Sequence, residues 1–225
     1  EEKTLEIKKQ SEVVSNLVKK TKTELVDILD RKSFEENWII KVIKMIEKNE
    51  AHESRELHQA WHVWIYNSKW EVLLQKRSMK KSSYPWLWDI SAAWHISSWE
   101  TMEEWTLREL WEELGNAIIE ELEKNKLEPL FSYTEDVKRI IKWKDWYNNE
   151  LNQIYLLKYD WPVENLDMQE WEVDELKFIP IEQFEKELEE QFKIEKLELR
   201  TYVLQRPEYY TQLLLWMKKR MAKIK

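Results

Sequence analysis

The order of apolar and polar positions along this chain predicts short strands on either side of one amphipathic helix. Two apolar runs, His62–Tyr66 and Val72–Arg77, flank a turn at Asn67–Trp70 and are expected to form a β-hairpin. Glu24–Asp30 is expected to open the fold as a strand, and the apolar stretch Ile39–Ile46 is expected to pair with it. Strand pairing should therefore dominate the beginning of the chain.

The central helix is predicted over Thr101–Leu114, which lacks Pro and Gly and has an apolar stripe through Met102, Leu107, Leu110 and Leu114. The remaining predicted strands are Asp89–Ala93, Leu127–Thr134, Val137–Lys142, Leu151–Tyr159 and Leu176–Ile179, followed by helices at Glu182–Phe192 and Pro207–Lys223. Mixed strands followed by terminal helices predict an α+β fold, with a mixed β-sheet sandwiched between α-helices.

The domain organisation expected from this pattern is one main domain with two extensions. Residues 1–22 are polar with a weak helical period and form an N-terminal extension. Residues 23–190 form the domain, and residues 191–225 form a C-terminal helical extension. A chain of 225 residues that is 43% hydrophobic is long enough for one domain with extensions, or at most two small domains.

Composition narrows the expected class of protein. The formal net charge of −8 argues against a protein that binds nucleic-acid backbones, which requires a basic surface. No apolar run approaches the roughly 20 residues that span a membrane, and no signal-peptide core is present near the start. The absence of Cys fits a reducing compartment and excludes thiol catalysis. We therefore expect a soluble, cytoplasmic protein with a small-molecule partner, compatible with a homodimer.

Three carboxylates on the predicted helix are candidate metal ligands. Glu109, Glu112 and Glu113 occupy positions i, i+3 and i+4, so their side chains share one face within a turn. Like charges this close repel by a few tenths of a kcal/mol per pair unless a cation neutralises them. Oxygen-rich clusters suit Mg²⁺ or Mn²⁺, which can also bridge phosphates. The alternative is a solvated acidic face, which is the role expected of four other glutamates: Glu103, Glu104, Glu120 and Glu121.

The segment around this helix resembles the Nudix box. Trp94 is followed after five residues by Glu100, and after seven more by Arg108 and Glu109, which is the family's spacing. The pattern falls on Trp94, Glu100, Arg108, Glu109, Leu110, Glu112, Glu113 and Gly115. Each residue fits the pattern except Trp94, which stands where the family has a Gly. The resemblance implies the Nudix fold and a metal-dependent hydrolase of a diphosphate linkage, acting on a nucleoside diphosphate-type substrate.

The resemblance also implies roles for individual residues. The expected ligands of Mg²⁺ or Mn²⁺ are Glu109, Glu112, Glu113 and the backbone carbonyl of Trp94. Either Glu109 or Glu150 is expected to act as the base that activates water, and Glu113 is a further catalytic candidate.

Other residues are expected to support the box or contact substrate. Arg108 should orient the box by pairing with a carboxylate such as Glu100, because Arg suits fixed bidentate pairing, and Gly115 closes the pattern. Substrate phosphate is the expected partner of Lys76, Arg77 and His95, with a purely surface role as the alternative for the first two.

A wider resemblance points to the Nudix subgroup nearest isopentenyl-diphosphate isomerase. It is carried by residues 58–67, 74–78 and 84–95, most specifically by Tyr-Pro-Trp-Leu-Trp-Asp at 84–89. The isomerases have a second metal site of histidines and glutamates, and four residues fall near its positions: His52, His58, His95 and Glu150. Two departures are a His52–His58 spacing one residue shorter and Asn148 in place of a second glutamate. The alternative is that these histidines are structural and hydrogen-bonded.

One position separates hydrolysis from isomerisation. The isomerases place a Cys directly before their Gly-His pair, whereas this chain has Ala93 there and no Cys elsewhere. The complete set of box carboxylates points in the same direction, toward hydrolysis. An isomerase-like enzyme and a catalytically inactive diphosphate-binding module stay open as alternatives.

The tryptophans are abnormal in number and position. The chain has 15 Trp and 1 Gly, whereas ordinary usage of about 7% Gly would give roughly 16. Several Trp fall in predicted turns, where Gly is favoured because it adopts positive φ freely. We therefore expect most of these Trp to stand for glycines, through UGA codons that encode Gly but are read as Trp. Trp64 and Trp88 are expected to be genuine, because the resembling family has Trp there.

Overall fold

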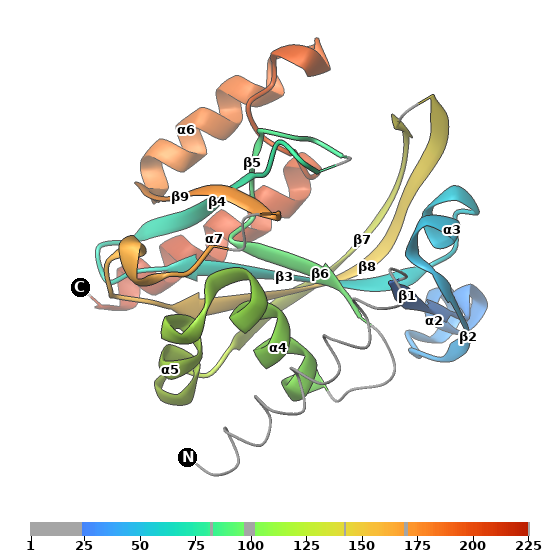
Figure 1. Ribbon diagram of the computed structural model, residues 1–225, viewed down its shortest axis with the longest axis horizontal. Helices are drawn as coiled ribbons and strands as arrows, with labels where there is room; N and C mark the ends of the chain where they lie inside the picture. The colour runs from blue at the N-terminus through green and yellow to red at the C-terminus, as the bar shows by residue number, and fades with distance from the viewer. Residues whose placement is uncertain (1–23, 82, 97–101, 142, 169–170, 225) are drawn as a thin grey trace. The chain divides into compact units, whose positions relative to one another are not determined.

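The computed structural model describes residues 24–81, 83–96, 102–141, 143–168 and 171–224 (Figure 1). Its strands are β1 (Leu25–Leu29), β2 (Val42–Glu47), β3 (His58–Tyr66), β4 (Glu71–Arg77), β5 (Trp88–Asp89), β6 (Ala92–His95), β7 (Glu128–Ile141), β8 (Lys144–Lys158) and β9 (Val173–Pro180). Its helices are α2 (Arg31–Asn37), α3 (Lys48–Glu53), α4 (Met102–Leu114), α5 (Asn116–Lys124), α6 (Ile181–Phe192) and α7 (Pro207–Ile224), with 3-10 turns η1 (Val163–Asn165) and η2 (Leu197–Leu199). The extension predicted over residues 1–22 lies outside the described residues.

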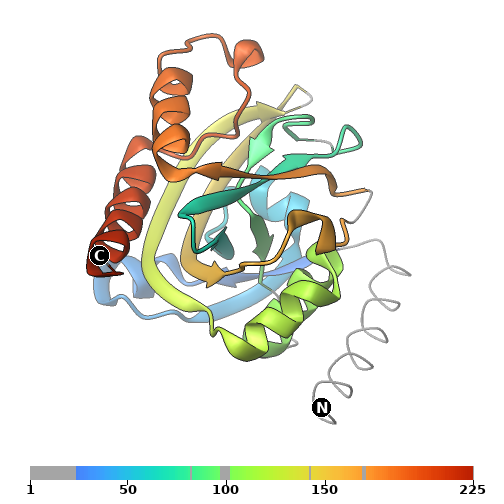
Figure 2. The same cartoon turned by 90° about the vertical axis from the view of Figure 1, so that its left-hand side faces the viewer.

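The chain divides into two compact units. Of the described residues, the first includes 24–61, 94–96, 102–109, 132–141 and 143–153, and the second includes 62–81, 83–93, 110–131, 154–168 and 171–224. Several elements, β3, β6, α4, β7 and β8, contribute residues to both units. Figure 2 shows β7 and β8 as long curved ribbons that run side by side, in agreement with their pairing.

In the first unit, β1 pairs antiparallel with β2, as predicted for the two opening apolar stretches. β1 also meets β3, where Ile28 lies opposite His58. Helix α2 follows because the Asp30 carboxylate accepts a hydrogen bond from the Ser33 backbone N–H at 3.2 Å, which caps the helix. One buried apolar cluster holds these elements together: Leu29, Phe34, Leu57 and Leu151.

In the second unit, the predicted hairpin of β3 and β4 forms, with Tyr66 opposite Val72. β4 pairs antiparallel with β9 on its other side, and Trp88 makes a parallel bridge with Tyr202, so the sheet is mixed. The core beside α6 and α7 is aromatic, and Trp64 donates its indole N–H to the Tyr209 hydroxyl at 2.8 Å. The predicted α+β class is therefore confirmed. Within the described residues, no helix is long and apolar enough to cross a membrane.

Three predictions about local structure were wrong or incomplete. The two strands predicted at Leu127–Thr134 and Val137–Lys142 are one continuous strand, β7, because its pairing with β8 carries it through the polar residues between them. Helices α2, α3 and α5 were not predicted. Glu121, expected on a solvated face, is only 6% exposed and accepts a hydrogen bond from the Trp161 indole N–H.

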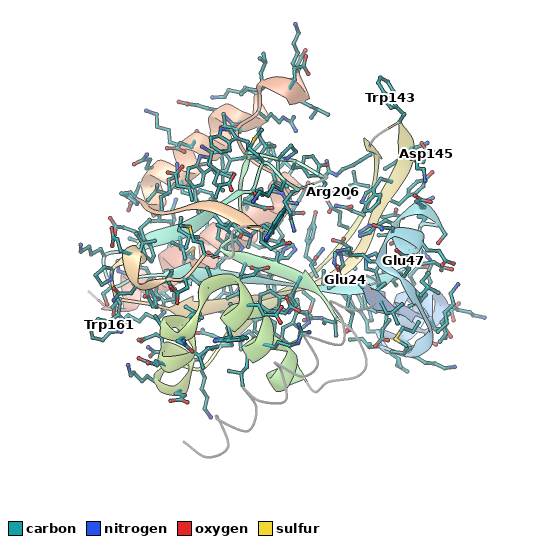
Figure 3. All side chains as sticks on the ribbon, in the orientation of Figure 1. Glu24, Glu47, Trp143, Asp145, Trp161 and Arg206 are labelled. Atoms are coloured by element: carbon teal, nitrogen blue, oxygen red, sulfur yellow. The ribbon has the colours of Figure 1, made fainter. Side chains whose placement is uncertain are left out.

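Four tryptophans occupy backbone conformations that favour glycine. The φ angle is 56° at Trp38, 61° at Trp70, 67° at Trp86 and 66° at Trp143, all in the left-handed region. Trp143 lies in the turn between β7 and β8, and Figure 3 shows it projecting away from the hairpin, where it is 98% exposed. By contrast, Trp64 is 1% exposed and hydrogen-bonded. These conformations support the glycine interpretation at the four turn positions.

Candidate functional site

Four side chains that could bind a metal converge within the first unit. They are His52 on α3, His58 on β3, His95 on β6 and Glu150 on β8. One nitrogen or oxygen atom from each lies within 4.8 Å of the others. His52 and His58 are buried, as is Glu150, while His95 is partly exposed. The four residues expected near a second metal site are thus brought together.

Backbone carbonyls determine which ring nitrogen faces the cluster at two of the histidines. His52 Nδ1 lies 2.9 Å from the carbonyl oxygen of Tyr147, and His58 Nδ1 lies 2.9 Å from that of Glu56. A carbonyl oxygen only accepts hydrogen bonds, so both Nδ1 atoms are protonated donors. The lone pair of each neutral ring is therefore on Nε2, the nitrogen commonly available to a metal.

Glu150 supplies the negative charge of the cluster. Its Oε1 lies 3.3 Å from His95 Nε2 and 3.7 Å from His58 Nε2. A tetrahedral ion with bonds of about 2.1 Å would hold its ligand atoms about 3.4 Å apart. These two separations are close to that value, and the widest in the cluster is within 4.8 Å. His58 Nε2 is buried and makes no hydrogen bond within the described residues. A buried nitrogen of this kind is costly unless a ligand completes it, so the residues fit a metal ion.

The donor set indicates which ions would suit this cluster. Three imidazoles and one carboxylate favour a transition-metal ion such as Zn²⁺ or Mn²⁺ over Mg²⁺, which prefers oxygen ligands. The carboxylate-rich box is chemically different, and Mg²⁺ or Mn²⁺ remains the ion expected there.

Burial and mutual contacts shift the pKa values of three residues in the cluster. Burial, with nearby positive charge on His95, lowers the pKa of His52 to about 3. Burial alone would raise the pKa of Glu150, but the close approach of the His58 and His95 rings holds the pKa of its carboxyl well below its usual range. Burial acts to lower the pKa of His95, yet its close contacts with the Glu150 and Glu24 carboxylates raise it overall. The two flanking carboxylates therefore favour the protonated form of His95.

The box glutamates lie on α4, as predicted. Glu109 is partly buried, and its Oε1 lies 2.8 Å from Nη1 of Arg108, which is itself 5% exposed. Arg108 thus pairs with its neighbour Glu109, while the expected partner, Glu100, lies outside the described residues. Glu113 is buried and Glu112 is partly buried. The apolar stripe holds the helix, since Leu110 and Leu114 are fully buried.

The two ends of the box differ. Gly115 has a φ of 81° and ends α4 before α5 begins, so its expected structural role fits the conformation found. Trp94, which stands at the family's first Gly, is on β6 and 6% exposed. Its indole N–H is buried and has no acceptor among the described residues, which is unfavourable for a genuine Trp. The assignment of its carbonyl as a metal ligand stays a prediction.

The two basic residues expected to contact substrate lie in the second unit. Arg77 donates to the Asp89 carboxylate at 2.9 Å and to the Ser83 carbonyl at 3.0 and 3.1 Å, so it braces the segment after β4. Lys76 Nζ lies 3.8 Å from the ring centroid of Trp86 and 3.5 Å from the Glu175 carboxylate. Phosphate binding by these two residues stays a prediction.

Two neighbours of the histidine cluster were not predicted from the sequence. Trp146 stacks on His52, with ring centroids 4.3 Å apart, and its indole N–H donates to the Asn148 side chain at 3.2 Å. Glu24 lies 3.6 Å from His95 Nδ1. Glu24 precedes β1 and His95 ends β6, so the two residues are far apart in the sequence. No local spacing signals their contact.

The fold and the two groups of candidate ligands define an α+β protein with a box helix and a separate histidine-carboxylate cluster. Comparison with known proteins assigns the family: the profile of the NUDIX domain matches residues 56–199. The chain belongs to the Nudix family.

Two relatives and one solved structure describe this membership further. The chain is 36% identical over 140 residues to Nudix hydrolase 3 of Arabidopsis thaliana, an alignment that covers 61% of this chain but 17% of that protein. It is 38% identical over 71 residues to the isopentenyl-diphosphate Delta-isomerase of Pectobacterium atrosepticum, covering 32% of this chain and 40% of that enzyme. A crystal structure from Deinococcus radiodurans, 17% identical, matches with a TM-score of 0.57 over 87% of this chain and 98% of that one, which confirms the fold. The predicted resemblance to both hydrolases and isomerases is thus confirmed.

Proposed function

We propose that this protein hydrolyses a phosphoanhydride bond in a nucleoside diphosphate-type substrate. The observation that carries the proposal is the complete set of box carboxylates, Glu109, Glu112 and Glu113, on helix α4. Family membership supports it, because the similar Arabidopsis protein is named a hydrolase. The aligned part is a small share of that protein, so its name does not specify a substrate here.

The box residues divide the work of binding and proton transfer. Glu109, Glu112 and Glu113, with the Trp94 carbonyl, would hold Mg²⁺ or Mn²⁺. When bound, such an ion supplies positive charge that neutralises a diphosphate and activates water for attack on phosphorus. Arg108 keeps Glu109 in place through their ion pair.

Glu109 is the better of the two proposed bases. Glu150 is buried between two histidines, and its strongly lowered pKa makes it a weak proton acceptor. Its surroundings favour the role of a metal ligand, together with His52, His58 and His95. A transition-metal ion in this cluster would bring further positive charge to the first unit.

A second candidate function is isomerisation of a prenyl diphosphate. The histidine cluster and the similarity to an isopentenyl-diphosphate isomerase favour it. Ala93 opposes it, because the isomerases use a Cys at that position to move a proton at carbon, and this chain has no Cys. Hydrolysis requires no proton transfer at carbon and therefore no such Cys, so we rank hydrolysis first.

One assay series separates these functions. Nucleoside diphosphate sugars, dinucleoside polyphosphates and isopentenyl diphosphate would each be incubated with the protein and Mg²⁺ or Mn²⁺. Phosphate and nucleotide products are measured, together with deuterium exchange from solvent into isopentenyl diphosphate. Cleavage without exchange is the expected result. Exchange without cleavage would replace hydrolase by isomerase, and neither activity across the panel would favour an inactive binding module.

A further inference from the structure

His95 lies between two carboxylates, one on each ring nitrogen. Its Nε2 faces Glu150 Oε1 at 3.3 Å, on the cluster side. Its Nδ1 faces Glu24 Oε1 at 3.6 Å, on the opposite side of the ring. Glu24, labelled in Figure 3, directly precedes β1, while His95 ends β6. The contact therefore joins the start of the fold to the histidine cluster.

Glu24 is itself held by one residue of α3. The carbonyl of Glu24 accepts a hydrogen bond from the Lys48 backbone N–H at 2.8 Å, and the Lys48 ammonium pairs with Glu24 Oε2. Lys48 begins α3, and His52 follows four residues later on the same helix. Helix α3 thus carries both Lys48, which holds Glu24, and His52, which belongs to the cluster.

Each histidine of the cluster has an oxygen acceptor beside its Nδ1 atom, but the type of acceptor differs at His95. The Nδ1 atoms of His52 and His58 donate to backbone carbonyls. Among the described residues, the partner of His95 Nδ1 is the Glu24 carboxylate. A histidine that binds a metal through Nε2 is oriented by the acceptor on its other nitrogen, and a carboxylate there also makes the imidazole a stronger ligand.

We propose that Glu24 is the positioning residue of the cluster, which holds His95 so that Nε2 faces Glu150 and a metal ion. Glu24 acts through His95 and does not itself bind the ion, because it lies on the far side of the ring. This inference rests on the proposed role of the cluster as a metal centre. It adds a residue that belongs to neither the box nor the four predicted ligands.

The test measures Zn²⁺ affinity by calorimetry on the full chain with Glu24→Ala and Glu24→Gln. Loss of an orienting partner typically weakens metal binding by about 10- to 100-fold, which is the effect expected for Glu24→Ala. Glu24→Gln should fall between Glu24→Ala and the unchanged protein, because the amide oxygen keeps an acceptor beside Nδ1 but carries no charge. A His58→Ala variant identifies the part of the binding that belongs to the cluster.

The matched control is Glu53→Gln. Glu53 is on α3 beside His52 and pairs with Lys144 at 2.9 Å, so the change also removes one charge and one ion pair near the cluster. Glu53 contacts none of the histidine rings through a described interaction. The Zn²⁺ affinity of the Glu53→Gln variant should therefore stay within about twofold of that of the unchanged protein. Should Glu24→Ala fail to fold, Lys48→Met removes the ammonium that pairs with Glu24 and should also weaken Zn²⁺ binding.

A spectroscopic measurement separates positioning from a general loss of charge. The chain has four histidines, so two-bond ¹H–¹⁵N spectra of the Zn²⁺-bound protein can be assigned. His95 should show a protonated Nδ1 whose signal shifts in Glu24→Ala and stays unchanged in Glu53→Gln. Equal Zn²⁺ affinity in the unchanged protein and Glu24→Ala, with His58→Ala weakened, would overturn the role of Glu24 alone. Equal affinity in His58→Ala would overturn the metal centre itself.

Discussion

Gly115 and Asp167 approach so closely that a Cβ on residue 115 would lie 2.6 Å from the Asp167 Cβ. Contacts that short do not occur between real Cβ atoms, and the φ of 81° at Gly115 already disfavours a side chain. The single glycine of the chain is thus at a position where only glycine fits. The four tryptophans with positive φ show the opposite situation, a bulky residue where glycine suits the backbone.

We predict that Trp143→Gly stabilises the protein. Trp143 has a φ of 66° and is 98% exposed, so the substitution relieves backbone strain and sacrifices little packing. A gain of about 1 kcal/mol in the free energy of unfolding is expected, measured by urea denaturation. Trp64→Gly is the matched control and should cost about 3–5 kcal/mol, because Trp64 is buried. Destabilisation by Trp143→Gly would argue that this Trp is a genuine part of the turn.

Peptide sequencing tests the origin of the tryptophans directly. If UGA codons encode glycine, protein purified from its native cells should carry Gly at positions 38, 70, 86 and 143, and Trp at 64 and 88. Tandem mass spectrometry distinguishes the two residues by mass. Native peptides with Trp at positions 94 and 99 would rule out recoding in the box.

Loss of one box carboxylate should remove catalysis and leave the fold intact. We predict that Glu112→Gln or Glu113→Gln lowers turnover by about two orders of magnitude or more, since the ion held by the box activates the attacking water. Removing one of several like charges on a helix also relieves repulsion, so circular dichroism should change little. Glu120→Gln, at an exposed position on α5, serves as the control. Near-normal turnover in both box variants would show that these glutamates form a solvated face.

Ala93 separates the proposed reaction from isomerisation. The unchanged protein should hydrolyse a diphosphate and exchange no deuterium into isopentenyl diphosphate, because it lacks a Cys to move the proton. Ala93→Cys should retain hydrolysis, since the box residues are unchanged. Hydrolysis is followed by product release and exchange by mass spectrometry. Strong exchange by the unchanged protein would contradict this assignment.

Stability of the metal-free protein should fall as pH falls from about 6.5 to 5. The pKa of His52 is lowered to about 3 in the folded protein, so the unfolded chain binds a proton that the folded chain does not. Stability then falls by up to about 1.4 kcal/mol per pH unit as pH decreases. The pKa of His95 is raised, so protonation of His95 increases stability as pH falls toward about 6.5. Near pH 5 this residue is protonated in both the folded and the unfolded chain and no longer changes the slope. His52→Gln, studied by urea denaturation with EDTA, should show a smaller slope, and an unchanged slope would contradict the His52 assignment.

Several features followed from the sequence because they depend on neighbours along the chain. The spacing of Glu109, Glu112 and Glu113 determines that they share one helix face, whatever the rest of the fold does. The alternation around residues 62–77 likewise determines a hairpin, and the breadth of the match at 94–115 indicates the family. Local geometry carries this information.

Other features were decided by tertiary structure. Strand pairing made β7 continuous where its own sequence indicated a break, and the fold buries Glu121, which accepts a hydrogen bond from the Trp161 indole N–H. The sequence suggested four members of the histidine cluster only through a resemblance. Their spacing along the chain says nothing about the 3.3 Å between His95 and Glu150, or about the approach of Glu24. These contacts join α3, β3, β6 and β8 across large sequence separations, and only the pairing and packing of those elements determine which side chains meet.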